Sequence, residues 1–200
     1  MKIKNIQIDK DKLFFTSDTH FFHKNILQYC NRPFADVAEM NDHLVELWNS
    51  VVPTDGVVFH LGDVSLTANP KHLEELLGKL NGKIFLIVGN HESDVLTKAY
   101  IRDKFEEIYD VAEIFIKDEE ITYGEQHIVM CHYPMIVWNG SHRGSWQLFG
   151  HVHGGMSSKG MEGHPTTSMD VGVDCHNYTP ISYQQVKEHI TKQVLEHAHN

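Results

Sequence analysis

Five short apolar runs in this chain of 200 residues each end directly in a group of polar side chains. The polar groups are, in order, Asp18 with His20, Asp63, Asn90 with His91, His132, and His151 with His153. Helical patterns separate the runs, which is typical of βα units and a layered α/β fold. Strand ends in such sheets converge on a crevice where ligands bind. We therefore predict one site assembled from distant parts of the chain.

The apolar patterns also predict where the helices and strands lie. We expect strands over residues 2–8, 13–16, 56–60, 83–88, 111–117, 120–123, 127–131, 146–149 and 169–173. We expect helices over 36–50, 69–78, 93–102 and 182–196. Asp36 suits a helix cap and Pro70 suits a first helical position. Because the chain has no repeat or linker, we expect residues 1–200 to form a single domain.

Charge and composition narrow the classes of partner. The chain has 27 acidic and 17 basic side chains, a formal net charge of -10. Because long nucleic acids bind mainly through Lys and Arg, an extended nucleic-acid partner is not expected. A small anionic substrate is compatible, since bound divalent cations reverse the local charge. The sequence shows no signal peptide and no membrane span, so we expect a cytoplasmic protein with no membrane partner, and its oligomeric state stays open.

The three cysteines do not suggest a disulfide framework. Cys30, Cys131 and Cys175 are odd in number and lack the CxxC spacing of a structural zinc site. We expect buried, reduced thiols.

The combination and order of the polar motifs resemble the calcineurin-like metallophosphoesterase family. The motifs are Asp18-Thr19-His20, Gly62-Asp63, Gly89-Asn90-His91-Glu92, His132 and Gly150-His151-Val152-His153. The similarity covers positions 18 to 153, and the stretches 17–23 and 170–176 also resemble small bacterial and phage members. The resemblance implies the α/β fold of that family, a layered β-sandwich of two mixed sheets flanked by helices. At this length, an elaborate cap domain is not expected.

The resemblance also implies a role for each motif residue. Two divalent metal ions would be held, the first by Asp18, His20 and His153, the second by Asn90, His132 and His151, with Asp63 bridging both. His91 would stay off the ions and face the leaving group of the substrate, next to Asn90. Glu92 would orient His91, although many family members carry Asp at that position.

These residue types suit phosphoester hydrolysis. Two ions about 3.5–4 Å apart share a bridging hydroxide and stabilise both ends of an in-line displacement. The nitrogen and oxygen ligands suit Mn, Fe, Co, Ni or Zn better than Ca, and affinity order does not choose among these metals. We expect Mn first, with Fe, Zn, Ni or Co as alternatives. A protonated His91 could donate to the departing oxygen. We predict hydrolysis of phosphodiester or phosphomonoester bonds in a small, nucleotide-like substrate.

Several further polar residues have two possible roles. His23 is a candidate for contacting substrate phosphate or a plain helix-entry residue. Arg143, in a loop before the 146–149 run, is a candidate phosphate ligand or a solvated cation, and Arg32 shares that ambiguity. Asp174 and His176 either form a turn or hydrogen-bond the metal ligands. We expect core packing for Cys131, Trp138 and Trp146.

Two other functions remain as alternatives. A metal-dependent nuclease acting on single-stranded DNA or RNA would share the metal site, but the acidic charge disfavours its basic groove. A non-catalytic binding scaffold of the same fold would have an eroded site, whereas every ligand position and His91 are intact here.

Overall fold

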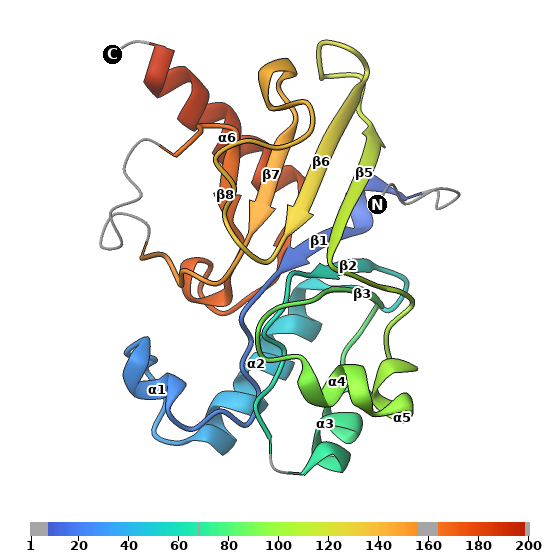
Figure 1. Ribbon diagram of the computed structural model, residues 1–200, viewed down its shortest axis with the longest axis vertical. Coiled ribbons are helices and arrows are strands. Elements are labelled where there is room, and N and C mark those ends of the chain that lie inside the picture. The colour runs from blue at the N-terminus through green and yellow to red at the C-terminus, as the bar shows by residue number, and fades with distance from the viewer. Residues whose placement is uncertain (1–7, 68, 156–163, 199–200) are drawn as a thin grey trace.

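The computed structural model describes residues 8–67, 69–155 and 164–198, which form two sheets with helices around them (Figure 1). The first sheet has the order β4-β3-β2-β1-β9, and its strands are β1 (Leu13–Thr16), β2 (Val57–His60), β3 (Lys83–Ile87), β4 (Ile108–Tyr109) and β9 (Ile181–Ser182). The second has the order β5-β6-β7-β8, and its strands are β5 (Val111–Lys117), β6 (Glu125–Cys131), β7 (Trp146–Phe149) and β8 (Ser168–Asp170). The helices are α1 (Ile26–Tyr29), α2 (Val37–Val51), α3 (Pro70–Leu77), α4 (Ser93–Thr97), α5 (Ala99–Arg102) and α6 (Tyr183–Ala198).

Both sheets are mixed, as expected. Strands β1 to β4 are parallel and β9 is antiparallel to β1. In the second sheet β6, β7 and β8 are parallel and β5 is antiparallel to β6. The carboxyl ends of β1, β2 and β3 therefore leave one edge of their sheet together, and those of β6 and β7 do the same in theirs.

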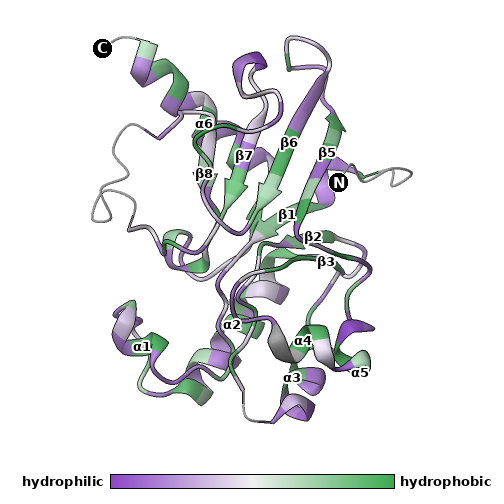
Figure 2. Ribbon diagram, viewed as in Figure 1, coloured by the Kyte–Doolittle hydropathy of each residue, from purple (hydrophilic) through white to green (hydrophobic). Residues whose placement is uncertain are grey.

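The main core lies between the two sheets. Phe15, Phe59 and Phe85 occupy neighbouring strands, with ring centroids 6.1 and 5.1 Å apart, and pack against Ile128 and Leu148 of the second sheet. Because adjacent strand residues face opposite sides, Phe14, Val58 and Ile84 pack instead against α2 and α3. The first sheet is thus buried on both faces, which explains its nearly continuous apolar strands (Figure 2).

The expected capping residues set the starts of two helices. The Asp36 carboxylate accepts hydrogen bonds from the backbone amides of Ala38 and Glu39 at the start of α2. The Asn69 side chain accepts from Lys71 N, with Pro70 in the first turn of α3. Both interactions satisfy amides that have no partner within the helix.

Some expected elements are wrong. The helix over 93–102 is two short helices, because Lys98 is extended (φ -106°, ψ 107°). The strand over 120–123 is a turn between β5 and β6, closed by a hydrogen bond from Gly124 N to Ile121 O. The strand over 169–173 ends at Asp170, and a 3₁₀ turn follows. The strand over 2–8 falls almost wholly outside the described residues.

The thiols also differ from expectation. Cys131 is buried, as predicted, whereas Cys30 is half-buried and Cys175 is exposed. Trp138 and Trp146 are buried, so their packing role is confirmed. Within the described residues, no helix combines the length and the apolar character that crossing a bilayer requires.

A buried carboxylate links the turn after β5 to both ends of the chain. Asp118 accepts hydrogen bonds from Lys10 Nζ (3.0 Å), Tyr183 Oη (2.9 Å) and Lys187 Nζ (2.7 Å). Burial alone would raise the pKa of Asp118, but the hydrogen bonds from Lys187, Lys10 and Tyr183 outweigh it and hold that pKa well below its usual range. The ion pairs connect the 3₁₀ turn at 10–12 and α6 to the second sheet.

We predict that Asp118→Ala lowers the free energy of unfolding by about 1–3 kcal/mol at pH 7, because it removes the buried acceptor of Lys10, Tyr183 and Lys187, although Lys187 keeps its contact with Glu120. Folding lowers the pKa of Asp118, so its contribution is present above the unfolded pKa near 3.9 and is lost as the pH falls toward the folded pKa. Urea unfolding at pH 7 and pH 3 should show a smaller difference from wild type at pH 3. Asp55→Ala, which removes the exposed pair with Lys12, should change little.

Candidate metal centre

The residues that follow five strands meet in one cavity. Its volume is about 830 Å³, and its walls include His20, Asp63, Asn90, His151 and His153. These side chains follow β1, β2, β3 and β7, and His132, which follows β6, lies directly behind them. The predicted convergence of strand ends is therefore what the structure shows.

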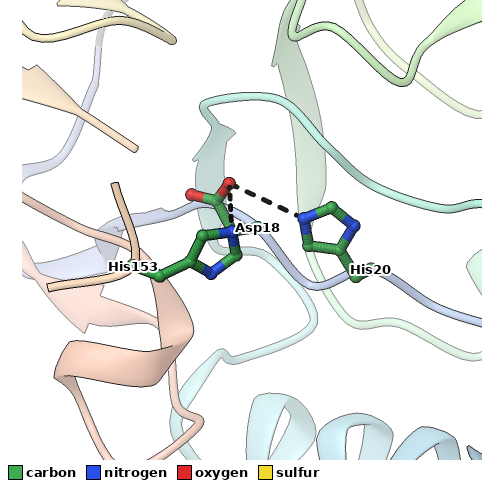
Figure 3. Close-up of side chains that lie close together, drawn as sticks. All are labelled: Asp18, His20 and His153. Atoms are coloured by element: carbon green, nitrogen blue, oxygen red, sulfur yellow. Dashed lines mark ion pairs between the residues drawn. The ribbon is translucent and has the colours of Figure 1, made fainter. Parts of the chain in front are cut away.

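Asp18, His20 and His153 form the first ligand group. Asp18 Oδ1 lies 3.9 Å from His20 Nε2 and 3.8 Å from His153 Nε2, so both rings direct a nitrogen at one carboxylate oxygen (Figure 3). Asp18 Oδ1 and His20 Nε2 are buried and have no hydrogen-bond partner among the described residues. Buried polar atoms without partners are rare, and a shared cation would satisfy both. These residues therefore fit a metal ion.

The second ligand group contains Asp63, His132 and His151. The amide oxygen of Asn90 lies 3.1 Å from His132 Nε2 and extends this group. His132 Nδ1 lies 2.7 Å from the carbonyl oxygen of Leu61 and must donate to it, because a carbonyl only accepts. That hydrogen bond leaves the Nε2 lone pair free to bind a metal ion.

Asp63 lies between the two groups. Its Oδ2 atom is 3.5 Å from His20 Nε2, and its Oδ1 atom is 3.6 Å from His132 Nε2. Ligand atoms about 2.1 Å from a common ion lie roughly 3–3.5 Å apart, so each oxygen is placed to serve one group. This arrangement fits the bridging role that the family resemblance implies.

Burial changes the protonation of the first ligand group. It raises the pKa of Asp18 to about 7 and lowers the pKa of His20 to about 2. A buried anion and a neutral imidazole are both good ligands, and a divalent cation would favour the ionised form of Asp18. A divalent cation in this group would therefore replace a proton on Asp18.

Five ligand residues have left-handed backbone conformations. The φ angles are 58° for Asp18, 50° for His20, 56° for Asp63, 69° for His151 and 51° for His153. Each costs about 1–2 kcal/mol for a residue with a side chain, and such strain clusters at functional sites. His151 and His153 therefore share the site through a tight bend and not through an extended segment.

Close contacts between loops explain the glycines in the motifs. A Cβ atom at Gly150 would collide with Ser17 Oγ and Asp18 Oδ2, and one at Gly89 would collide with Asp63 Oδ1. Gly62 has a φ of 96°, and its Cβ would come within 2.7 Å of the Gly89 backbone. The loops can carry their ligands this close together only because these positions lack side chains.

Glu92 has a different role from the one expected. Its two carboxylate oxygens accept hydrogen bonds from Val64 N (2.8 Å) and Gly89 N (2.6 Å), and the side chain is buried. Burial raises the pKa of Glu92 to about 7. The assignment of Glu92 to orienting His91 is corrected: Glu92 instead ties together the loops that carry Asp63 and Asn90.

His91 lies beside the ligand groups, as expected. Its Nε2 atom is 3.9 Å from Asp63 Oδ2, its side chain is 34% exposed, and it lines the cavity. His23 also lines the cavity, and its Nδ1 atom lies 3.1 Å from His20 Nδ1. His23 thus helps to hold the His20 ring while facing the cavity.

Arg143 does not reach this site. It lines a separate cavity of about 250 Å³ with Phe115, Tyr123 and His127. Arg143 precedes β7, whereas the ligands His151 and His153 follow that strand, so the strand separates them. The expectation that Arg143 contacts the substrate phosphate is therefore wrong.

Two weaker candidates lie behind the ligands. Asp174 accepts a hydrogen bond from His153 Nδ1 at 2.7 Å, and Arg32 is buried against Asp174. Arg32 is therefore not a substrate clamp. Burial lowers the pKa of His153, but the contacts with Asp174, Cys30 and Asp18 outweigh this and raise it to about 10. His176 instead contacts the Asp170 carbonyl through Nε2.

The sequence motifs did not predict one wall of the cavity. Asn25, Ile26 and Tyr29, at and within α1, face the ligand groups together with Leu66. None of these residues belongs to a motif. Their only sequence signal is that Asn25 and Ile26 closely follow His20 and His23.

Comparison with known proteins identifies a family whose members share the sequence features of this chain. The sequence profile described as calcineurin-like phosphoesterase matches residues 12–172. With the fold and the ligand groups in place, this match shows that the chain belongs to the calcineurin-like phosphoesterase family.

Three similar proteins extend the comparison. An uncharacterised protein of Methanocaldococcus jannaschii is 36% identical over 183 residues, which cover 90% of this chain and 92% of the relative. The gene 66 protein of Mycobacterium phage L5 is 28% identical over 71% of this chain and 77% of its own length. A solved structure of a protein of unknown function from Aquifex aeolicus has a TM-score of 0.65 and 23% identity, covering 88% of this chain and 97% of that one. The last similarity concerns the fold alone.

We predict that Gly150→Ala abolishes stable ion uptake, because the new methyl group displaces Asp18 from the first ligand group. Gly144→Ala is the matched control: Gly144 also lies in a loop flanking β7, and a Cβ there would meet nothing within 4 Å. At its φ of 81° the control should cost only about 1–2 kcal/mol of stability. Metal content after dialysis, measured by mass spectrometry, distinguishes the two variants. Equal ion content would show that the close approach at Gly150 is not required.

Proposed function

We propose that this protein is a phosphoesterase that uses two divalent ions, with manganese the best candidate, to hydrolyse phosphodiester bonds in small nucleotide-like substrates. The observation that carries the proposal is the position of Asp63, with one carboxylate oxygen facing each ligand group. A carboxylate shared in this way supports a pair of ions, and paired ions are suited to phosphoryl chemistry.

The roles of the ligands follow from their contacts. Asp18, His20 and His153 would hold one ion, and Asn90, His132 and His151 would hold the other. When bound, the ions would supply positive charge for the phosphoryl oxygens and activate water for in-line attack. Asn90 is exposed at the cavity surface, so its side chain also suits contact with substrate.

His91 is suited to proton transfer. Its ring lies beside His20, with centroids 5.4 Å apart, and its backbone amide donates to Asp63 Oδ1 at 3.0 Å. The backbone contact fixes the residue next to the bridging carboxylate and leaves the imidazole in the cavity. A protonated His91 would there donate a proton to the oxygen of the departing alcohol. His23, on the other side of His20, would contact the phosphate.

A substrate screen tests the proposal. Protein stripped with EDTA and reloaded with Mn²⁺ should hydrolyse bis(p-nitrophenyl) phosphate or a cyclic nucleotide, while single-stranded DNA should be degraded poorly. Asp63→Asn keeps the shape of the side chain but not its charge, and should lose turnover and most bound metal. Absence of turnover on every diester after loading with Mn, Fe, Zn, Ni or Co would contradict the proposal. Efficient DNA degradation would favour the nuclease alternative.

We predict that His91→Ala lowers kcat by roughly 10²–10⁴ while both ions are retained, as expected for loss of a general acid. The loss should be smaller for a p-nitrophenyl ester than for an alkyl ester, since a good leaving group needs less protonation. Steady-state rates on both esters, with metal content measured in parallel, check this. The same loss on both esters would argue that His91 acts in some other way.

A further inference from the structure

A buried arginine uses all of its hydrogen-bond donors behind the first ligand group. Arg32 Nε and Nη2 donate to the two carboxylate oxygens of Asp174, each at 2.8 Å. Nη2 also donates to the carbonyl of Asp18 (2.7 Å), and Nη1 donates to the carbonyl of Thr19 (2.9 Å). The last donor, on Nη1, contacts Met40 Sδ at 3.4 Å. An arginine has five N–H groups, so the guanidinium is fully used in the protein interior.

These contacts connect three separate parts of the chain to one ligand group. The carbonyl contacts hold the backbone at Asp18 and Thr19, within the strained turn that presents Asp18 and His20. Through Asp174 the same guanidinium reaches His153, whose Nδ1 donates to Asp174 Oδ2 at 2.7 Å. Because Nδ1 is used in that hydrogen bond, Nε2 is the nitrogen directed toward Asp18, and a bound ion would take the place of its proton.

The second ligand group is supported differently. Behind His132 lies the neutral carbonyl of Leu61, whereas an anionic carboxylate lies behind His153. A carboxylate behind a ligating imidazole raises its basicity and fixes its orientation more strongly than a carbonyl does. The two groups therefore differ in the acceptor behind one of their histidines: a carboxylate paired with Arg32 lies behind His153, and a backbone carbonyl lies behind His132.

We propose that Asp174 and Arg32 are positioning residues that selectively strengthen binding of the ion held by Asp18, His20 and His153. This inference rests on the proposed two-ion function and adds that the two ion sites differ in how their ligands are held. Asp174 orients His153 and polarises its ring. Arg32 neutralises Asp174 and holds the turn that carries the other two ligands.

A third ion at Asp174 is the competing explanation. Asp174, His153 and Cys30 have possible ligand atoms within 4.8 Å of one another. However, both oxygens of Asp174 already accept from the Arg32 guanidinium, and a second cation at that position would face its positive charge. The geometry therefore assigns Asp174 to hydrogen bonding.

Proteins that retain one ion site at a time provide the test. His151→Ala leaves the first ligand group complete, and His20→Ala leaves the second. Asp174→Asn is added to each, and the Mn²⁺ dissociation constant is measured from the electron paramagnetic resonance signal of free Mn²⁺. We expect the affinity to fall about 10–100-fold in the His151→Ala protein and to stay within about twofold in the His20→Ala protein.

Arg32→Lys tests the guanidinium in the same two backgrounds. A lysine keeps the charge but cannot bond both Asp174 oxygens and two carbonyls at once, so affinity should again fall only at the first site. Asp118→Asn is the control for general destabilisation, because it disturbs another buried carboxylate with no contact to the ligand groups. It should lower stability and leave both dissociation constants unchanged.

The outcomes separate this inference from the proposed function. Equal weakening at both sites, weakening at the second site only, or no weakening at all would overturn the role of Asp174. If wild-type protein binds two Mn²⁺ ions and hydrolyses diesters in these cases, the proposed function stands without it. If wild-type protein binds none of Mn²⁺, Fe²⁺, Zn²⁺, Ni²⁺ and Co²⁺, the proposed function fails and this inference fails with it.

Discussion

The hydrogen bond from His151 N to Asp18 Oδ2, 2.9 Å long, joins the two sheets at the carboxyl ends of β7 and β1. Asp18 follows β1 of the first sheet and His151 follows β7 of the second. The bond occupies one oxygen of Asp18 and leaves the other, Oδ1, toward His20 and His153. It requires a backbone approach that only Gly150 permits. The site exists because the two sheets come together at this point.

The same junction concentrates charge in the interior. Asp18 and Asp63 are both buried, within reach of several imidazoles but of no buried lysine among the described residues. Buried carboxylates need a compensating positive charge. Arg32 supplies it for Asp174, behind the ligands, and a pair of divalent ions would supply it for Asp18 and Asp63. The arrangement thus separates a permanent cation, which organises the site, from the ions that would act on a substrate.

The backbone strain at the ligand residues is matched by hydrogen bonds from residues around the site. The left-handed backbone conformations of the ligand residues raise the free energy of the folded state, and the surrounding hydrogen bonds offset that increase. Glu92 ties the loops after β2 and β3 through Val64 N and Gly89 N, and Arg32 ties the turn after β1. The geometry of the ligand groups therefore depends on side chains that lie outside them, and these supporting contacts differ between the two groups.

The sequence by itself determined the fold class, the positions of most strands along the chain and most of the residues that meet at the candidate site. Those features are local: apolar runs, helix caps at Asp36 and Asn69, and short motifs in a fixed order. It failed for Arg143 and Glu92, because proximity along the chain is not proximity in space: β7 separates Arg143 from the ligands that follow it, and Glu92 meets backbone amides of two loops. The pairing of Arg32 with Asp174, 142 positions apart, was decided only by the tertiary structure. Packing of the sheets brings such residues together, and no local pattern encodes that distance.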